Sequence, residues 1–128
     1  MMTDRARILL ADRDKLMLDI LRDLLKTKYE IVGEVEDGLA LIRVAQELKP
    51  DIVVSDITMP PLTGLEAMSL IKKDLPEVKF VFLSNHADPG YLTEAMHLGA
   101  SGYVLNKSGS CELLAAIGEV LEGRRHVA

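Results

Sequence analysis

The chain has one cysteine, Cys111, which cannot form a disulfide within the chain and is expected to be an inert small side chain. It also lacks an apolar run of about 18 residues, the length that a membrane-spanning helix requires. Residues 1–5 lead directly into a strand-like stretch and do not resemble a signal peptide. These absences favour a cytoplasmic protein that makes no membrane contact.

Positive charge is scarce, because 15 Lys and Arg residues stand against 20 Asp and Glu residues and the formal net charge is −5. Proteins that bind nucleic-acid phosphates usually carry the opposite balance. The chain has 128 residues, 48% of them hydrophobic, which suits one compact domain over residues 1–128 and is too short for two. We expect a single domain that does not bind DNA by itself.

Short apolar runs alternate with longer amphipathic stretches along the whole chain, which is typical of an α/β fold. The runs are nearly continuous in apolar residues, as strands covered on both faces require. The expected strands are Ile8–Ala11, Ile31–Val35, Ile52–Ser55, Phe80–Leu83 and Tyr103–Leu105, and the expected helices lie around 17–25, 41–48, 67–75, 92–96 and 113–121, with prolines in the connections. The pattern predicts a (βα)₅ doubly wound parallel sheet whose last helix ends at Gly123.

Polar residues stand where these strands are expected to end, and strand ends of a parallel sheet meet at one edge. Asp12 and Asp56 would repel each other there unless Mg²⁺ or a basic side chain lay between them. An ionised aspartate needs no general base to act as a nucleophile, so Asp56 could accept a phosphoryl group. The Ser84 hydroxyl could then donate to a phosphoryl oxygen. Taken alone, an aspartate after a strand is more often a cap or turn residue.

The segment from Asp51 to Gly64, D-I-V-V-S-D-I-T-M-P-P-L-T-G, resembles the phosphoacceptor segment of bacterial response-regulator receiver domains. The similarity extends through the chain, to the family's first, fourth and fifth strands and the loop after the fourth. The matching segments are Ile8–Asp12, Phe82–Asp88 and Gly99–Leu105. Residues 84–88 and 115–125 resemble the subclass whose receiver precedes a LuxR-type helix-turn-helix domain.

This resemblance implies a flavodoxin-like receiver fold with strand order 2-1-3-4-5, and a signalling domain of a two-component phosphorelay that is not an enzyme. Asp56 would be phosphorylated, and Mg²⁺ would be held by Asp12, Asp56 and the backbone carbonyl of Thr58. Ser84 would take the family's hydroxyl position, and Tyr103 would be the aromatic switch residue whose rotamer reports activation.

The same resemblance implies the partners. A sensor histidine kinase or phosphotransfer protein would donate the phosphoryl group, and a DNA-binding output domain, covalent or downstream, would receive the signal. The face formed by the fourth helix, the fifth strand and the fifth helix would bind the output domain or a second copy of the chain.

Two positions of the expected site depart from the family's pattern. The family usually has a second acidic metal ligand directly after the first aspartate, where this chain has Arg13; Asp14 could substitute from the next position. An alignment without a gap places Asn106 where the family has a conserved lysine. The adjacent Lys107 could serve only through a bulge or a one-residue shift, because neighbouring strand residues point to opposite faces.

We expect the Arg13 guanidinium to lie near Asp56 or Asp12, because replacing an acid by arginine changes the local charge by two units. Mg²⁺ binding would then be weak or absent. Two functions stay open: a receiver driven by phosphorylation, and a pseudo-receiver that is regulated without it.

Other residues are predicted to be structural. Gly64 would permit a tight turn into the third helix. His86, His97 and His126 are too scattered for a metal site, and Lys72–Lys73 and Arg124–Arg125 are expected to be solvated charges. The tripeptide at 12–14 also matches the D-x-D start of haloacid-dehalogenase-like phosphohydrolases, but Leu16 stands where those enzymes have threonine.

Overall fold

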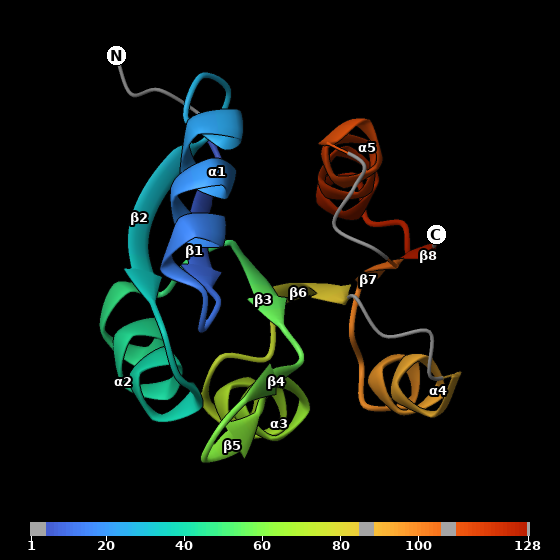
Figure 1. The fold of residues 1–128 in the computed structure, drawn as a ribbon. Helices are drawn as coiled ribbons and strands as arrows, with labels where there is room; N and C mark the ends of the chain where they lie inside the picture. Colours follow the sequence, from blue (N-terminus) through green and yellow to red (C-terminus); the bar gives the residue numbers. More distant parts are fainter. Residues whose placement is uncertain (1–4, 85–88, 106–109, 128) are drawn as a thin grey trace.

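An all-parallel sheet forms the centre of the protein in a computed structural model that describes residues 5–84, 89–105 and 110–127 (Figure 1). The strands lie in the order β2-β1-β3-β6-β7-β8, and every adjacent pair is parallel. They are β1 (Arg7–Ala11), β2 (Glu30–Val35), β3 (Ile52–Asp56), β6 (Lys79–Ser84), β7 (Gly102–Leu105) and β8 (His126–Val127). The first five confirm the expected order 2-1-3-4-5.

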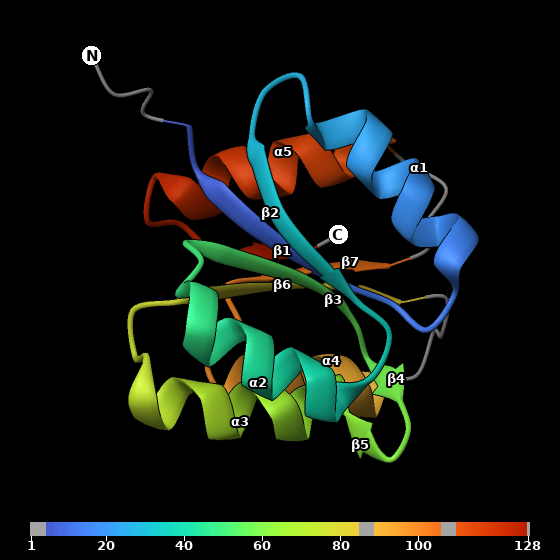
Figure 2. The same cartoon turned by 90° about the vertical axis from the view of Figure 1, so that its left-hand side faces the viewer.

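Helices cover both faces of this sheet, as the alternating pattern predicted. Figure 2 shows α1 and α5 on one side and α2, α3 and α4 on the other. The helices are α1 (Lys15–Leu25), α2 (Gly38–Leu48), α3 (Gly64–Asp74), α4 (Pro89–His97) and α5 (Ser110–Leu121). Among the described residues, none of the helices is long and apolar enough to cross a membrane.

Alternate residues of each central strand enter different hydrophobic clusters, because successive side chains of a strand point to opposite faces. In β1, Ile8 and Leu10 pack with Leu18 of α1 and Ile117 of α5. Leu9 belongs to the other cluster, under α2, α3 and α4. The central strands are therefore mostly apolar, and their polar side chains lie at or next to the strand ends.

Three short strands were missing from the sequence prediction. β4 (Thr58–Met59) and β5 (Leu62–Thr63) form an antiparallel hairpin outside the main sheet, around a cis peptide between Pro60 and Pro61. β8 adds a sixth strand beside β7. Strands of two residues are too short to show an alternating pattern, so periodicity could not identify them.

The prediction that all prolines lie in connections was wrong for Pro89, which begins α4. The first turn of a helix tolerates proline, because an N–H at that position has no partner within the helix. The prediction that Lys72 is a simple solvated charge was also wrong. Its ammonium donates to the carbonyl of Val78 at 2.9 Å and of Pro76 at 3.4 Å. Burial lowers the pKa of Lys72, and repulsion from Lys79 adds to this effect.

A matched pair of isoleucines tests the assignment of the core. Ile8 is 0% exposed in the central strand, whereas Ile20 is 51% exposed on α1. We expect Ile8→Val to lower the free energy of unfolding by about 0.5–1.5 kcal/mol, because the lost methylene leaves a cavity. Ile20→Val should change it by less than about 0.5 kcal/mol. Urea denaturation measures both, and equal effects would contradict the burial of Ile8.

Candidate functional site

Three polar side chains meet at the carboxyl edge of the sheet. Ala11 pairs with Ser55 across β1 and β3, which places Asp12 level with Asp56. Asp56 is in register with the residue of β6 that precedes Ser84. The structure thus brings Asp12, Asp56 and Ser84 to neighbouring strand ends, as the sequence predicted.

All three side chains are buried, with 1% of Asp12, 7% of Asp56 and 0% of Ser84 exposed. Within the described residues, the other buried polar side chain is that of Ser55. Carboxylates are rarely buried, because removing a charge from water costs free energy unless a partner compensates. The buried polar groups of the described chain are therefore concentrated at this one edge.

The backbone of Asp56 is held by two of its neighbours. The Ser55 hydroxyl donates to the Asp56 carbonyl at 2.7 Å, and Gly64 packs so tightly that a Cβ there would collide with the same carbonyl. Sequence reasoning missed Ser55; its signal was a single hydroxyl within an apolar run. Gly64 begins α3, and the close approach of the Asp56 carbonyl, not a positive φ, is what requires glycine there.

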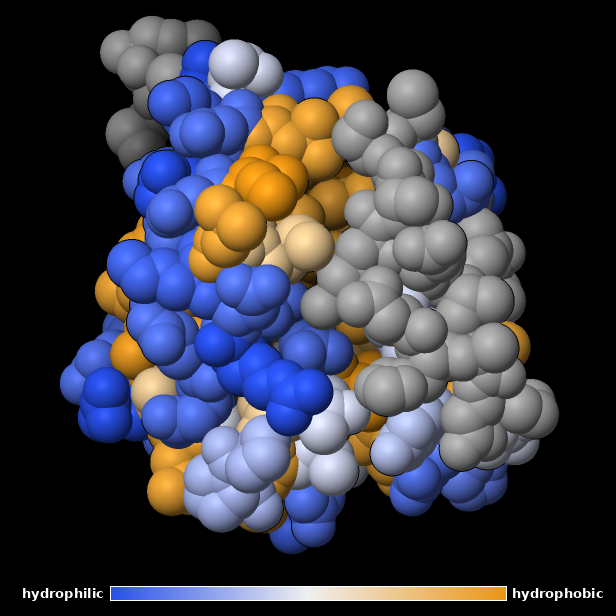
Figure 3. Space-filling view, viewed as in Figure 1, coloured by the Kyte–Doolittle hydropathy of each residue, from blue (hydrophilic) through white to orange (hydrophobic). Residues whose placement is uncertain are grey.

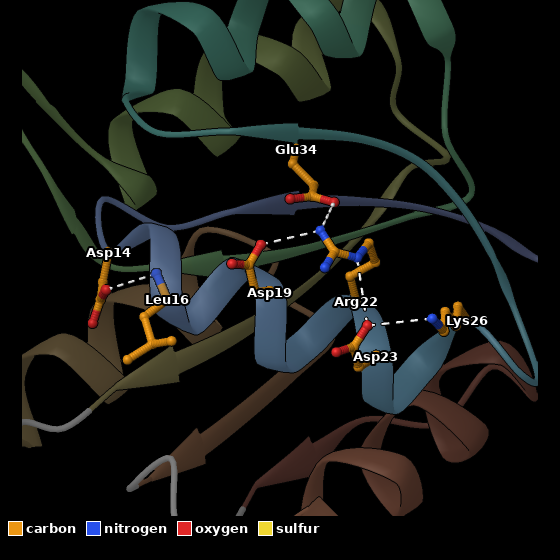
Figure 4. A network of polar contacts seen from close by, with 7 residues as sticks. All are labelled: Asp14, Leu16, Asp19, Arg22, Asp23, Lys26 and Glu34. Carbon is orange, nitrogen blue, oxygen red and sulfur yellow. Dashed lines mark hydrogen bonds and ion pairs between the residues drawn. The ribbon is translucent and has the colours of Figure 1, made fainter.

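The loop after β1 folds around the two aspartates that begin and end it. The Asp12 amide donates to the Val35 carbonyl at 3.0 Å, and an Asp12 carboxylate oxygen accepts from the Asp14 amide at 2.9 Å. Asp14 is the N-cap of α1, and its carboxylate accepts from the Leu16 amide at 3.0 Å (Figure 4). In this structure the carboxylate of Asp14 satisfies the helix N-terminus.

A group of charges further along α1 fixes the helix against β2. The Arg22 guanidinium donates to Glu34 of β2 at 3.3 Å and to Asp19 at 3.1 Å (Figure 4). The hydrogen bond to Glu34 raises the pKa of Arg22 above its ordinary value. The N-cap at one end of α1 and this contact at the other orient the helix that begins beside the site.

Arg13 lies in the same loop with its side chain exposed. Within the described residues, no ion pair or hydrogen bond joins its guanidinium to Asp12 or Asp56, so the expected contact is not present here. Asn106, the other position that departs from the family's pattern, and the adjacent Lys107 lie outside the described residues. In the part of the chain that is described, no group of three or more His, Cys, Asp or Glu side chains forms a metal site.

The remaining predicted residues lie in the hairpin after β3, in β7 and at the end of α4. Thr58 is in β4, two residues after Asp56, and is half-buried. Tyr103 lies in β7 in register with Phe82, and 2% of it is exposed. Its ring belongs to the cluster under α2, α3 and α4, so the aromatic residue faces the core. His97 is exposed, as expected, whereas His86 lies outside the described residues.

A family model described as the response regulator receiver domain matches residues 8–118 of this chain. The match covers all the strand ends described above. The chain belongs to the response-regulator receiver family, and the resemblance inferred from its motifs is confirmed.

Curated relatives include transcriptional regulators of similar sequence. The transcriptional regulatory protein MctR of Rhizobium johnstonii is 33% identical over 126 residues, which are 95% of this chain and 59% of that protein. YdfI of Bacillus subtilis is 32% identical over 119 residues, 91% of this chain and 55% of that protein. The chain thus spans a little over half the length of these relatives.

Solved structures share the fold. A two-component response regulator of the LuxR family from Aurantimonas sp. SI85-9A1 has a TM-score of 0.91 and 34% identity, with 96% of this chain and 89% of that one covered. The isolated REC domain of RcsB from Salmonella enterica serovar Typhimurium, solved with the phosphomimetic BeF3-, has a TM-score of 0.89 and 24% identity, with coverage of 98% and 94%. The latter likeness concerns the fold alone.

Gly64 offers a test of how tightly the Asp56 backbone is held. We expect Gly64→Ala to lower the free energy of unfolding by about 1–3 kcal/mol, because the new methyl group overlaps the Asp56 carbonyl. The matched control is Gly118→Ala within α5, where a Cβ meets nothing within 4 Å. That change should raise stability by about 0.5–1 kcal/mol through the better helix propensity of alanine. Denaturant unfolding measures the free energy of unfolding of both variants. A Gly64→Ala variant as stable as the wild type would contradict the tight packing against the Asp56 carbonyl.

Asp14 can be tested as a cap separately from any metal binding. Asp14→Ala should lower the free energy of unfolding by about 1 kcal/mol, because the Leu16 amide loses its acceptor. Asp14→Ser should restore most of that loss. If Asp14 is a cap and not a metal ligand, Asp14→Ser leaves the Mg²⁺ affinity measured by calorimetry at the wild-type value. A weaker Mg²⁺ affinity in this variant would assign Asp14 to the metal instead.

Proposed function

We propose that this chain is a cytoplasmic receiver that accepts a phosphoryl group on Asp56. The observation that carries the proposal is the strand register that buries Asp56 between Asp12 and Ser84 at one sheet edge. The carboxylate of Asp56 would attack phosphorus and form an acyl phosphate, while the bond between phosphorus and the histidine nitrogen of a donor protein breaks. The donor would be a sensor histidine kinase or a phosphotransfer protein.

The neighbouring side chains have separate tasks in this proposal. The hydroxyl of Ser84, at the end of the next strand, would donate to a phosphoryl oxygen. Asp12, Asp56 and the Thr58 carbonyl would hold Mg²⁺, which would neutralise charge on the phosphoryl group. Two buried carboxylates suit such a hard cation. Arg13, which stands at the usual second acidic position, removes one ligand, and we expect the affinity for Mg²⁺ to be low.

The surface beside the acceptor edge suits a protein donor. Leu16 and Ile20 are 66% and 51% exposed on neighbouring turns of α1, and Figure 3 shows apolar surface over and beside this helix. Exposed apolar groups of this kind favour contact with another protein. The N-cap loop at 12–14 lies at the start of the same helix, so a donor bound there would be near Asp56.

The output would be transcriptional. Relatives that carry the name of transcriptional regulators are longer than this chain, and their additional length would include a DNA-binding output domain. The signal would pass from Asp56 through Tyr103 to the face formed by α4, β7 and α5, which would contact that output domain or a second copy of the chain. The chain itself is acidic and would leave DNA contacts to the output domain.

A pseudo-receiver is the second candidate, and two residues favour it. Arg13 and Asn106 replace an acidic metal ligand and a lysine that the receiver pattern provides. A chain without them could keep the fold and the signalling face while a binding partner, and not phosphorylation, regulates it. The two candidates differ in whether Mg²⁺ and a phosphodonor change the protein at all.

A variant with the family's usual residues at positions 13 and 106 tests the proposed phosphorylation of Asp56. With acetyl phosphate and Mg²⁺, intact-mass measurements should show slow phosphorylation of the wild type, and none of Asp56→Asn. The control Asp23→Asn removes a carboxylate that is 61% exposed on α1 and should leave the rate unchanged. Arg13→Asp combined with Asn106→Lys should raise both the rate and the Mg²⁺ affinity, because it returns a ligand and a cation.

Three results would contradict this account. Rapid phosphorylation of the wild type would show that Arg13 does not weaken the site. If the double variant gained neither phosphorylation rate nor Mg²⁺ affinity, Arg13 and Asn106 would not be the cause of slow phosphorylation and weak Mg²⁺ binding. No phosphorylation of the wild type by any donor, with the fold intact, would favour the pseudo-receiver.

A further inference from the structure

The chain that leaves α5 turns back and covers the edge of β7. Gly123 has a φ of 87°, and the amides of Gly123 and Arg124 donate to the carbonyls of Val120 and Glu119, which ends the helix. The following residues form β8, with His126 opposite Gly102 and Val127 opposite Tyr103. Figure 1 shows β8 beside β7, in the sheet between α4 and α5. We name Arg124–Val127 the strap.

Arg125 connects the strap to the end of α4. Its guanidinium donates to the carbonyl of Met96 at 2.5 Å and to the carbonyl of Ala100 at 3.2 Å and 3.3 Å. Arg125 is exposed, as predicted for a solvated charge, but its hydrogen bonds to these carbonyls were not predicted. Met96 lies in the last turn of α4, where the negative end of the helix dipole favours a cation. Arg125 thus supplies the charge that the C-terminus of a neighbouring helix needs.

The hydrogen bonds of Arg125 require the left-handed turn that follows α4. Gly99 has a φ of 106°, and the amides of Gly99 and Ala100 donate to the carbonyls of Met96 and Ala95. This left-handed turn carries the chain from α4 toward β7. Arg125 bonds to carbonyls on both sides of the turn, so its contacts depend on where α4 ends.

Arg124, the neighbouring arginine, makes no such contact with the end of α4 within the described residues. The Arg124 guanidinium pairs with Glu122 at 2.5 Å, and 62% of its side chain is exposed. Both residues of that pair belong to the chain just beyond α5, so the pair does not reach α4. Arg124 and Arg125 therefore carry the same charge on the same segment with different contacts.

We propose that the strap is a conformational link that makes docking of the chain beyond α5 depend on the position of α4. The Arg125 bonds exist only when the end of α4 lies where it does here, so they stabilise this position and the docked strap together. By thermodynamic reciprocity, a change that moves α4 weakens the strap, and release of the strap loosens α4. The strap also occupies the edge of β7, on the face that partners would use.

The trigger of this link rests on the proposed function. If Asp56 is phosphorylated and the change reaches α4, the strap would be released, and the chain that leads toward an output domain would change its path. The link itself needs no phosphoryl group, because its contacts are present in the protein as described. Coupling and trigger can therefore be tested separately.

Hydrogen exchange measured by mass spectrometry on the whole chain tests the coupling. In Arg125→Gln, exchange should rise at least about fivefold in peptides from the last turn of α4 and from β7, because charged hydrogen bonds are lost. The matched variant Arg124→Gln should exchange like the wild type. Peptides from β1 and β2 serve as the internal reference for any change in global stability.

Gly99→Ala tests the same link from the other side. Alanine is strained at a φ of 106°, so the turn after α4 should shift, and exchange should rise in β8 relative to β1. Local acceleration confined to residues 125–127 in Arg125→Gln, or unchanged exchange of β8 in Gly99→Ala, would overturn the link. So would equal effects of the two arginine variants.

The trigger is tested by adding acetyl phosphate and Mg²⁺ to the wild type, with intact mass as the measure of phosphorylation. Faster exchange of the strap in the phosphorylated protein supports the trigger, and unchanged exchange in that protein overturns it. Absence of phosphorylation contradicts the proposed function instead. In that case the two variants still decide whether the strap and α4 are coupled.

Discussion

Parallel pairing of β1, β3 and β6 fixes where charge can lie in this protein. The strands are mostly apolar because helices cover both faces, so polar side chains gather at or next to the strand ends. The register then aligns those ends and gathers Asp12, Asp56 and Ser84 into one buried group. The same pairing that builds the core therefore concentrates these buried polar side chains at one edge.

Different neighbouring residues hold different parts of this buried polar group in place. The hydroxyl of Ser55 and the missing side chain of Gly64 fix the Asp56 carbonyl, and Asp14 fixes the start of α1. Because Asp14 caps a helix, it is not simply a spare acid that can replace the residue lost at Arg13. In this loop the carboxylates on both sides of Arg13, those of Asp12 and Asp14, accept hydrogen bonds from backbone amides.

Much of the fold was predictable because period-2 and period-3.6 patterns are strong in a doubly wound sheet. The place of Asp56 at the end of a central strand could be predicted by the same reasoning, since strand ends follow from strand patterns. The hairpin at 58–63 and β8 were not, because two residues carry no period. The contacts of Lys72 and Arg125 were also beyond prediction. A sequence shows a charge, whereas the accepting carbonyl depends on the path of the loop after α3 for Lys72 and on the end of α4 for Arg125.

The most direct test of the central claim locates the phosphoryl group itself. The whole chain is incubated with a phosphodonor and Mg²⁺, and the labelled peptide is identified by mass spectrometry under conditions that preserve an acyl phosphate. The account predicts one label, on Asp56, that is lost on treatment with hydroxylamine. A label on any other residue, or an unlabelled protein under conditions that phosphorylate a typical receiver, would contradict it.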